Sequence, residues 1–207
     1  MDFSTALRTE RLVAIIRGSD QEASFRTVMA LVEAGIPLVE VSLSGTAALK
    51  VIERARIELG NAAWLGAGTV VTEEDAQRAA QAGANLIVTP GLGPGFRASV
   101  LQGLPTLAGV LTPSEVCEAA ATDATALKVF PASALGGPAY LKALRAPFPD
   151  LPFVPVGGVG TAEAVEYLQL GAVAVGVGSP LVGDAADDGG DLAALRRRAA
   201  EFRAVCS

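Results

Sequence analysis

The chain has 207 residues, of which 51% are hydrophobic and 18% are charged, and its formal net charge is −6 at pH 7. This length suits one domain with a sizeable core, and the hydrophobic content excludes a disordered chain. An acidic chain lacks the basic surface that binds nucleic acid or an anionic membrane, so neither is an expected partner.

Eight short apolar runs alternate with longer stretches of helical pattern along the chain. The expected strands are residues 12–17, 38–43, 64–70, 86–89, 106–110, 126–130, 153–156 and 174–177. The expected helices are about 21–34, 47–59, 73–82, 95–101, 113–121, 138–146, 162–170 and 192–205. Thr72 and Thr112 are expected to cap helices, and glycines such as Gly35 and Gly83 are expected to end them.

The order of these elements predicts the fold class. Strands that are apolar along their length are typical of a parallel sheet covered on both faces. Eight strand–helix units predict a (β/α)8 barrel, with a doubly wound sheet as the alternative. No linker or change of composition divides the chain, so residues 1–207 are expected to form a single barrel domain. Active sites of such barrels lie at the carboxyl ends of the strands.

The residue types present narrow the chemistry. The chain has no histidine, which excludes Ser-His-Asp and Cys-His catalysis and metal sites with histidine ligands. Cys117 and Cys206 have no metal-binding spacing. A disulfide between them and two free thiols in a reducing cytoplasm both fit the sequence. The N-terminus lacks the features of a signal peptide, and no apolar run spans a membrane without Gly, Pro or charge. The expected location is therefore the cytoplasm.

Lys128 is the most informative residue, because it lies inside the apolar run ALKVF at residues 126–130. Lysine is rarely buried unless it is paired or used, since burial disfavours the charged ammonium. A neutral amine can attack a ketone and form a Schiff base. The alternative is a lysine at a strand edge whose stem packs while its ammonium reaches water.

Glu40 and Arg17 are the next candidates. Glu40 lies in the apolar run PLVEVSL at residues 37–43, where burial would raise the pKa of its carboxyl and suit acid–base catalysis. An ion pair with Arg17 or Lys128 is the alternative, and both interpretations can hold. Arg17 ends the first expected strand, where its guanidinium could bind a carboxylate or could simply be a surface arginine.

Glycines follow the last two expected strands. Gly157 and Gly158 come after the seventh strand, and Gly178 and Ser179 after the eighth. Loops at these positions of a barrel often bind phosphate through backbone N–H groups, although ordinary glycine turns have the same composition. The segment GAGT at 66–69 is expected to let a ligand approach the backbone closely.

Four segments have the sequences LGAGTV at 65–70, VTPG at 88–91, LKVFP at 127–131 and PVGGV at 155–159. In order and spacing they resemble the 2-keto-3-deoxy-6-phosphogluconate and -galactonate aldolases. The resemblance implies a class I aldolase on a (β/α)8 barrel, usually a homotrimer, acting in sugar-acid breakdown of the Entner–Doudoroff type. Such enzymes split a phosphorylated 2-keto-3-deoxy sugar acid into pyruvate and D-glyceraldehyde 3-phosphate without a metal or an organic cofactor.

The resemblance also implies roles for individual residues. Lys128 would be the Schiff-base lysine and Glu40 the general acid/base. Thr69 and Pro90 would line the pyruvate end of the site. The phosphate would be held by Gly157, Gly158, Gly178 and Ser179.

Two departures from the gluconate-type pattern indicate the substrate. Gluconate-type enzymes commonly have an arginine in a segment EVTLRT, where this chain has EVSLSG at 40–45, so Arg17 is expected to bind the substrate carboxylate. They also commonly have threonine before the glycine pair, where this chain has Val156. The galactonate-type enzymes resemble the chain there and at residues 12–18. The expected substrate is the 6-phosphogalactonate compound, with the 6-phosphogluconate epimer as a second candidate.

Two other functions fit part of the pattern. A phosphate-binding isomerase or epimerase barrel would use Glu40 as a base and form no imine. A non-enzymatic barrel would only bind a phosphosugar. Neither alternative explains why Lys128 lies inside an apolar run.

Overall fold

In the computed structural model, which describes residues 2–207, parallel strands form a ring in the order β7-β6-β5-β4-β3-β2-β1-β8. A bridge between Val156 and Gly176 joins the two ends of this order. Neighbouring strands are consecutive in sequence, which confirms the (β/α)8 barrel over the doubly wound sheet. The strands are β1 (Leu12–Ile16), β2 (Leu38–Ser42), β3 (Trp64–Gly68), β4 (Leu86–Val88), β5 (Thr106–Val110), β6 (Ala126–Val129), β7 (Phe153–Pro155) and β8 (Val175–Val177).

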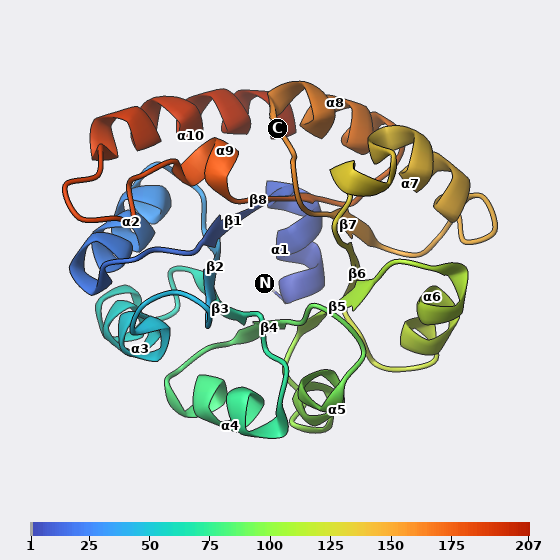
Figure 1. Cartoon of the computed structure of the whole chain (residues 1–207), viewed down its shortest axis with the longest axis horizontal. Helices are drawn as coiled ribbons and strands as arrows, with labels where there is room; N and C mark the ends of the chain where they lie inside the picture. Colours follow the sequence, from blue (N-terminus) through green and yellow to red (C-terminus); the bar gives the residue numbers. More distant parts are fainter. Residues whose placement is uncertain (1) are drawn as a thin grey trace.

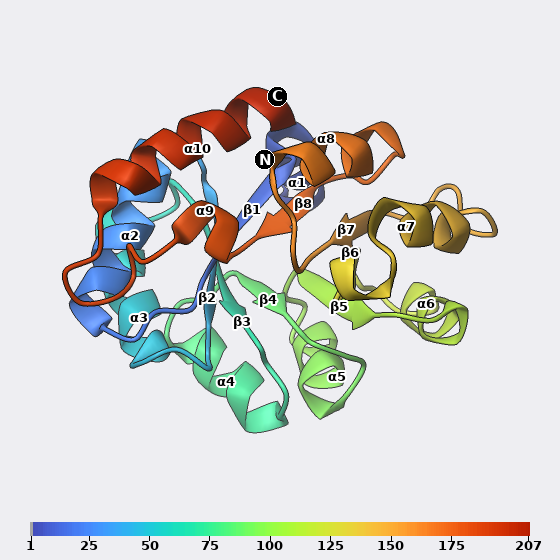
Figure 2. The same cartoon turned by 45° about the horizontal axis from the view of Figure 1, so that its top comes forward.

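Helices surround the ring of strands (Figures 1 and 2). Those expected are α2 (Gln21–Glu33), α3 (Ala48–Leu59), α4 (Glu73–Gln81), α5 (Pro94–Leu101), α6 (Pro113–Ala120), α7 (Gly137–Arg145), α8 (Thr161–Gln169) and α10 (Leu192–Cys206). Thr72 and Thr112 form capping boxes with Asp75 and Glu115, as their positions predict. No helix among residues 2–207 is long and apolar enough to cross a membrane.

Three short helical segments were not expected from the sequence: α1 (Phe3–Glu10), the 3-10 turn η1 (Ser133–Leu135) and α9 (Ser179–Val182). Helix α1 lies against one end of the barrel, and Phe3 and Leu7 are buried in the cluster that fills its interior. The Phe3 ring meets Trp64, the first residue of β3, edge to face at 5.1 Å between ring centres. Helix α1 therefore covers the amino-terminal end of the barrel, opposite the end where the predicted site residues lie.

Alternation along each strand decides which side chains face the barrel interior. Leu38 belongs to the interior cluster, whereas Val39 and Val41 belong to the outer cluster that packs against the helices. Glu40 and Ser42 have the same parity as Leu38, so both face inward. The same argument applied to Ala126, an interior residue of β6, directs Lys128 into the barrel.

Candidate active site

Lys128 is buried inside the barrel, with 6% of its surface exposed. Its strand pairs with β5 and β7, so the strand-edge alternative is wrong. Across β5 its partner is Gly109, where a Cβ would lie 2.2 Å from the carbonyl carbon of Pro90. The Lys128 ammonium nitrogen lies 5.3 Å from the ring centre of Phe130, a distance suited to a cation–π contact.

Glu40 is the second ionisable residue in the interior, and it is 2% exposed. Burial raises the pKa of its carboxyl, while the charges of Lys128 and Arg17 act in the opposite direction. The prediction of a raised pKa is confirmed. Among residues 2–207, neither Lys128 nor Arg17 makes an ion pair with Glu40. The alternative of a direct ion pair inside the barrel is therefore wrong. The carboxyl can therefore hold a proton at a higher pH than an exposed glutamate.

The glycines of β3 make room for this carboxyl. A Cβ on Gly68 would lie 1.8 Å from Oε1 of Glu40, and one on Gly66 would lie 3.0 Å from the Leu86 side chain. These contacts explain the two glycines without a ligand, and close approach of a ligand to this segment stays a prediction. Side chains of the protein itself occupy the space beside both of them.

A chain of hydroxyl groups follows Glu40 at the carboxyl end of β2. The Ser42 hydroxyl is fully buried and lies 2.8 Å from the Thr69 hydroxyl and 2.8 Å from the Ser44 hydroxyl. Thr69 has a backbone φ of +60°, in the left-handed region. Such a conformation is a genuine outlier for a β-branched residue.

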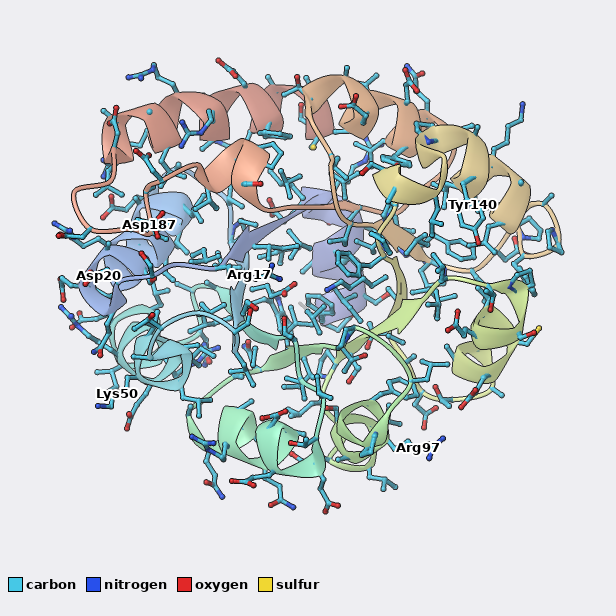
Figure 3. All side chains as sticks on the ribbon, viewed as in Figure 1. Arg17, Asp20, Lys50, Arg97, Tyr140 and Asp187 are labelled. Carbon is cyan, nitrogen blue, oxygen red and sulfur yellow. The ribbon has the colours of Figure 1, made fainter. Side chains whose placement is uncertain are left out.

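A cavity of about 280 Å³ opens at this end of the barrel. It brings together six of the predicted residues: Arg17, Val156, Gly157, Gly158, Gly178 and Ser179. Gly157 and Gly158 have φ of +100° and +68°, which side chains other than glycine rarely adopt. Arg17 lies near the centre of the ring, whereas Lys50 and Arg97 lie at its periphery (Figure 3).

The remaining predicted residues do not line this cavity. Lys128 is not one of its lining residues, but its ammonium lies near Phe130, which is. Pro90 is exposed and lines a separate hollow of about 260 Å³ beside Val71. Thr69 is half-buried and faces Ser42. The carboxyl end of the barrel thus holds all ten predicted residues, but not in one cavity.

Sequence reasoning missed the residues that hold the loop bearing Arg17. The Asp187 carboxylate accepts hydrogen bonds from the Ser19 backbone N–H at 3.0 Å and from the Ser19 hydroxyl at 2.6 Å. These bonds lower the pKa of Asp187. Thr27 donates to the Ala185 carbonyl at 2.8 Å. The loop after α9 is thereby fixed to the loop after β1, and no local sequence signal joins residues 168 positions apart.

Among residues 2–207, no group of three or more His, Cys, Asp or Glu side chains is arranged to hold a metal ion. Cys117 and Cys206 are both free thiols, the first exposed and the second buried.

Comparisons with known proteins show what the whole chain is similar to. The family model described as KDPG and KHG aldolase matches residues 3–197. The "Probable 2-dehydro-3-deoxy-6-phosphogalactonate aldolase" of Rhizobium meliloti is 38% identical over 82% of this chain and 81% of its own. The 2-dehydro-3-deoxy-phosphogluconate aldolase of Pseudomonas aeruginosa is 34% identical over 96% of this chain and 90% of its own. A solved structure of native KDPGal has a TM-score of 0.86 and 33% identity, covering 94% of this chain and 93% of that one.

Proposed function

Because the chain belongs to the KDPG and KHG aldolase family and is therefore an aldehyde-lyase, we propose that it is a Schiff-base aldolase with Lys128 as its nucleophile. The proposed substrate is 2-keto-3-deoxy-6-phosphogalactonate, and the products are pyruvate and D-glyceraldehyde 3-phosphate. The observation that carries the proposal is the burial of Lys128 in the barrel interior together with Glu40. An isomerase, an epimerase or a binding protein would need no such lysine.

The reaction would begin with imine formation. The amine of Lys128 attacks the C2 ketone and forms a carbinolamine. Glu40 donates a proton to the departing hydroxyl group, which leaves as water and yields an iminium ion. The raised pKa of Glu40 supports this role, because the group must carry a proton near neutral pH and then return it.

Bond cleavage would follow from the charge of the iminium. The C4 hydroxyl gives its proton to the Glu40 carboxylate left by dehydration, the C3–C4 bond breaks, and its electron pair moves into the enamine. Glyceraldehyde 3-phosphate leaves at this step. The enamine is then protonated at C3, and water hydrolyses the resulting imine to pyruvate and free Lys128. The iminium accepts the electrons, so the residues need no metal or organic cofactor for this chemistry.

The two ends of the substrate would bind at different parts of the site. Arg17 would pair with the carboxylate through its planar guanidinium. Gly157, Gly158, Gly178 and Ser179 would hold the phosphate through backbone N–H groups and a hydroxyl. The positive φ of the glycine pair and the shared cavity support this assignment.

Four finer assignments remain predictions. Val156 favours the galactonate compound as the substrate, and the gluconate epimer is the second candidate. The active form is expected to be a homotrimer, and the expected location is the cytoplasm. Thr69 and Pro90 are expected to line the pyruvate end of the site.

Covalent trapping tests the proposal. Borohydride added with pyruvate should inactivate the protein and leave a reduced pyruvyl group on Lys128, identified by peptide mass spectrometry. Lys50 and Lys142, both exposed, are internal controls and should stay unlabelled. Label on either control, or no adduct in active protein, would refute the Schiff base. EDTA should leave activity intact, and activity restored only by a divalent ion would indicate a metal-dependent aldolase instead.

A further inference from the structure

The side chain of Thr69 does not follow the alternation of the strand before it. In β3, Gly66 and Gly68 have the inward parity, as the contact of Gly68 with Glu40 shows. A continued strand would therefore point the side chain of Thr69 outward, toward the helices. Its φ of +60° interrupts the extended backbone of the strand. As a result, its hydroxyl lies 2.8 Å from the hydroxyl of Ser42, which faces inward.

The left-handed conformation of Thr69 needs support from its surroundings. Strained backbone of this kind persists only where neighbouring structure over-determines it, and it is concentrated at functional sites. The backbone around Thr69 is held on both sides: Leu43 donates to the Gly68 carbonyl at 2.8 Å, and Val70 donates to the Val88 carbonyl at 3.3 Å. The remaining contact is the side-chain hydrogen bond with Ser42.

The burial and the neighbours of Ser42 fix its hydroxyl for that contact. It is fully buried, and its hydroxyl has two hydroxyl partners, those of Thr69 and of the exposed Ser44. It also shares its strand face with Glu40, two residues earlier, and pairs in register with Gly68, which the Glu40 carboxylate overlies. Ser42 thus joins the strand that carries the acid–base group to the turn that carries Thr69.

We propose that Ser42 is a positioning residue of the active site, whose buried hydroxyl holds the Thr69 hydroxyl toward the site from its left-handed turn. Ser42 makes no contact with substrate in this scheme and acts only through Thr69. The inference rests on the proposed function, because it assumes that Thr69 faces the pyruvate end. It adds a residue to which the family resemblance gave no role.

A double-mutant cycle between Ser42→Ala and Thr69→Val tests this coupling. Ser42→Ala should lower kcat roughly 2- to 15-fold, the equivalent of one neutral hydrogen bond, and change KM less. Thr69→Val keeps the branched shape and removes the hydroxyl. In the Thr69→Val background, Ser42→Ala should cause no further fall in kcat. Independent, multiplicative effects of the two changes would overturn the proposal.

Conservative and matched variants separate positioning from a general loss of stability. Ser42→Thr keeps the hydroxyl and should retain most of the wild-type kcat, because threonine can make the same hydrogen bond to Thr69. If Ser42→Ala does not fold, Ser42→Cys has a similar size with a weaker donor and should show the same fall. Ser99→Ala is the control, because Ser99 is also fully buried and donates one hydrogen bond, to Gly95 in α5. It should lower Tm but not kcat.

The outcomes distinguish the two proposals. Wild-type protein that forms no borohydride-trapped adduct with pyruvate would refute the Schiff-base function itself. Wild-type protein that forms the adduct on Lys128, together with a Ser42→Ala variant of unchanged kcat, would refute only the role of Ser42. A Ser42→Thr variant with the same fall in kcat as Ser42→Ala would also contradict the role of Ser42.

Discussion

Gly68 and Glu40 fit together so closely that a methyl group on Gly68 would lie 1.8 Å from the Oε1 atom of Glu40. The same methyl group would lie 2.3 Å from the carboxyl carbon. No real contact is that short, so the position of the Glu40 carboxyl depends on the missing side chain at Gly68. A glycine of β3 thereby sets the geometry of the Glu40 carboxyl on β2, the proposed acid–base group.

Gly68→Ala is expected to displace the Glu40 carboxyl and lower kcat roughly 100-fold, because misplacement by about 1 Å can cost that much. Steady-state kinetics with the phosphorylated substrate measures the effect. Gly93→Ala is the matched control, since its nearest neighbour would be the Val71 carbonyl at 3.8 Å. A Gly68→Ala protein that folds and keeps wild-type kcat would show that the carboxyl position is unimportant.

Glu40→Gln keeps the shape of the side chain and removes the proton that titrates. If Glu40 is the general acid/base, kcat should fall roughly 10²- to 10⁴-fold. The wild-type pH profile should also contain a step above the usual range of a glutamate pKa, because burial raises the pKa of this carboxyl. That step should be absent from the variant. A step that persists in Glu40→Gln would assign it to another group.

Glu40 should also make stability depend on pH. Its pKa in the folded protein is raised above an ordinary value of 4.5, so folding favours the protonated form. This contribution is fully present below the unfolded pKa and is lost as the pH rises through the folded pKa. Glu40→Gln stays neutral, so its Tm should exceed that of the wild type at about pH 8, with the difference shrinking toward about pH 4.5. Calorimetry at several pH values measures this difference in Tm. A difference that stays the same at every pH would contradict the prediction.

The strands and the burial of Lys128 and Glu40 could be predicted because they depend on local apolar runs. The role of Gly68 could not be predicted from local patterns, because it depends on contact with a residue 28 positions away on another strand. The only indication in the sequence was indirect, since a buried glutamate on one strand needs small residues on the next strand. The contact between Ser19 and Asp187 had no such signal, since neither residue belongs to a periodic element.

Arg17 can be tested by its effect on substrate binding. Arg17→Ala should raise KM roughly 10- to 150-fold and change kcat less, because a hydrogen bond to a charged group contributes about 1.5–3 kcal/mol. Arg26→Ala, an exposed arginine on α2, should leave KM unchanged. The same Arg17 variant should also weaken binding of pyruvate alone, measured by the pyruvate concentration needed for borohydride trapping. An unchanged KM would assign Arg17 to structure.

Val156 occupies a tight position beside the glycine loop. It is buried, lines the cavity with Gly157 and Gly158, and its Cγ2 atom would lie 2.6 Å from a Cβ on Gly176. Threonine has nearly the same shape as valine, so Val156→Thr should keep this fit and add one hydroxyl. The variant therefore changes the polarity of the site with little change in its packing.

The galactonate and gluconate substrates differ only in the configuration of the C4 hydroxyl, which loses its proton during cleavage. Val156 offers only methyl groups, and a site without a polar partner discriminates weakly between such epimers. The wild type should cleave the galactonate compound well and the gluconate compound comparably or less well. Val156→Thr should shift the kcat/KM ratio toward the gluconate compound roughly 2- to 15-fold, the equivalent of one neutral hydrogen bond. A strong gluconate preference in the wild type, or an unmoved ratio in the variant, would refute this role of Val156 while leaving Lys128 and the aldolase chemistry untouched.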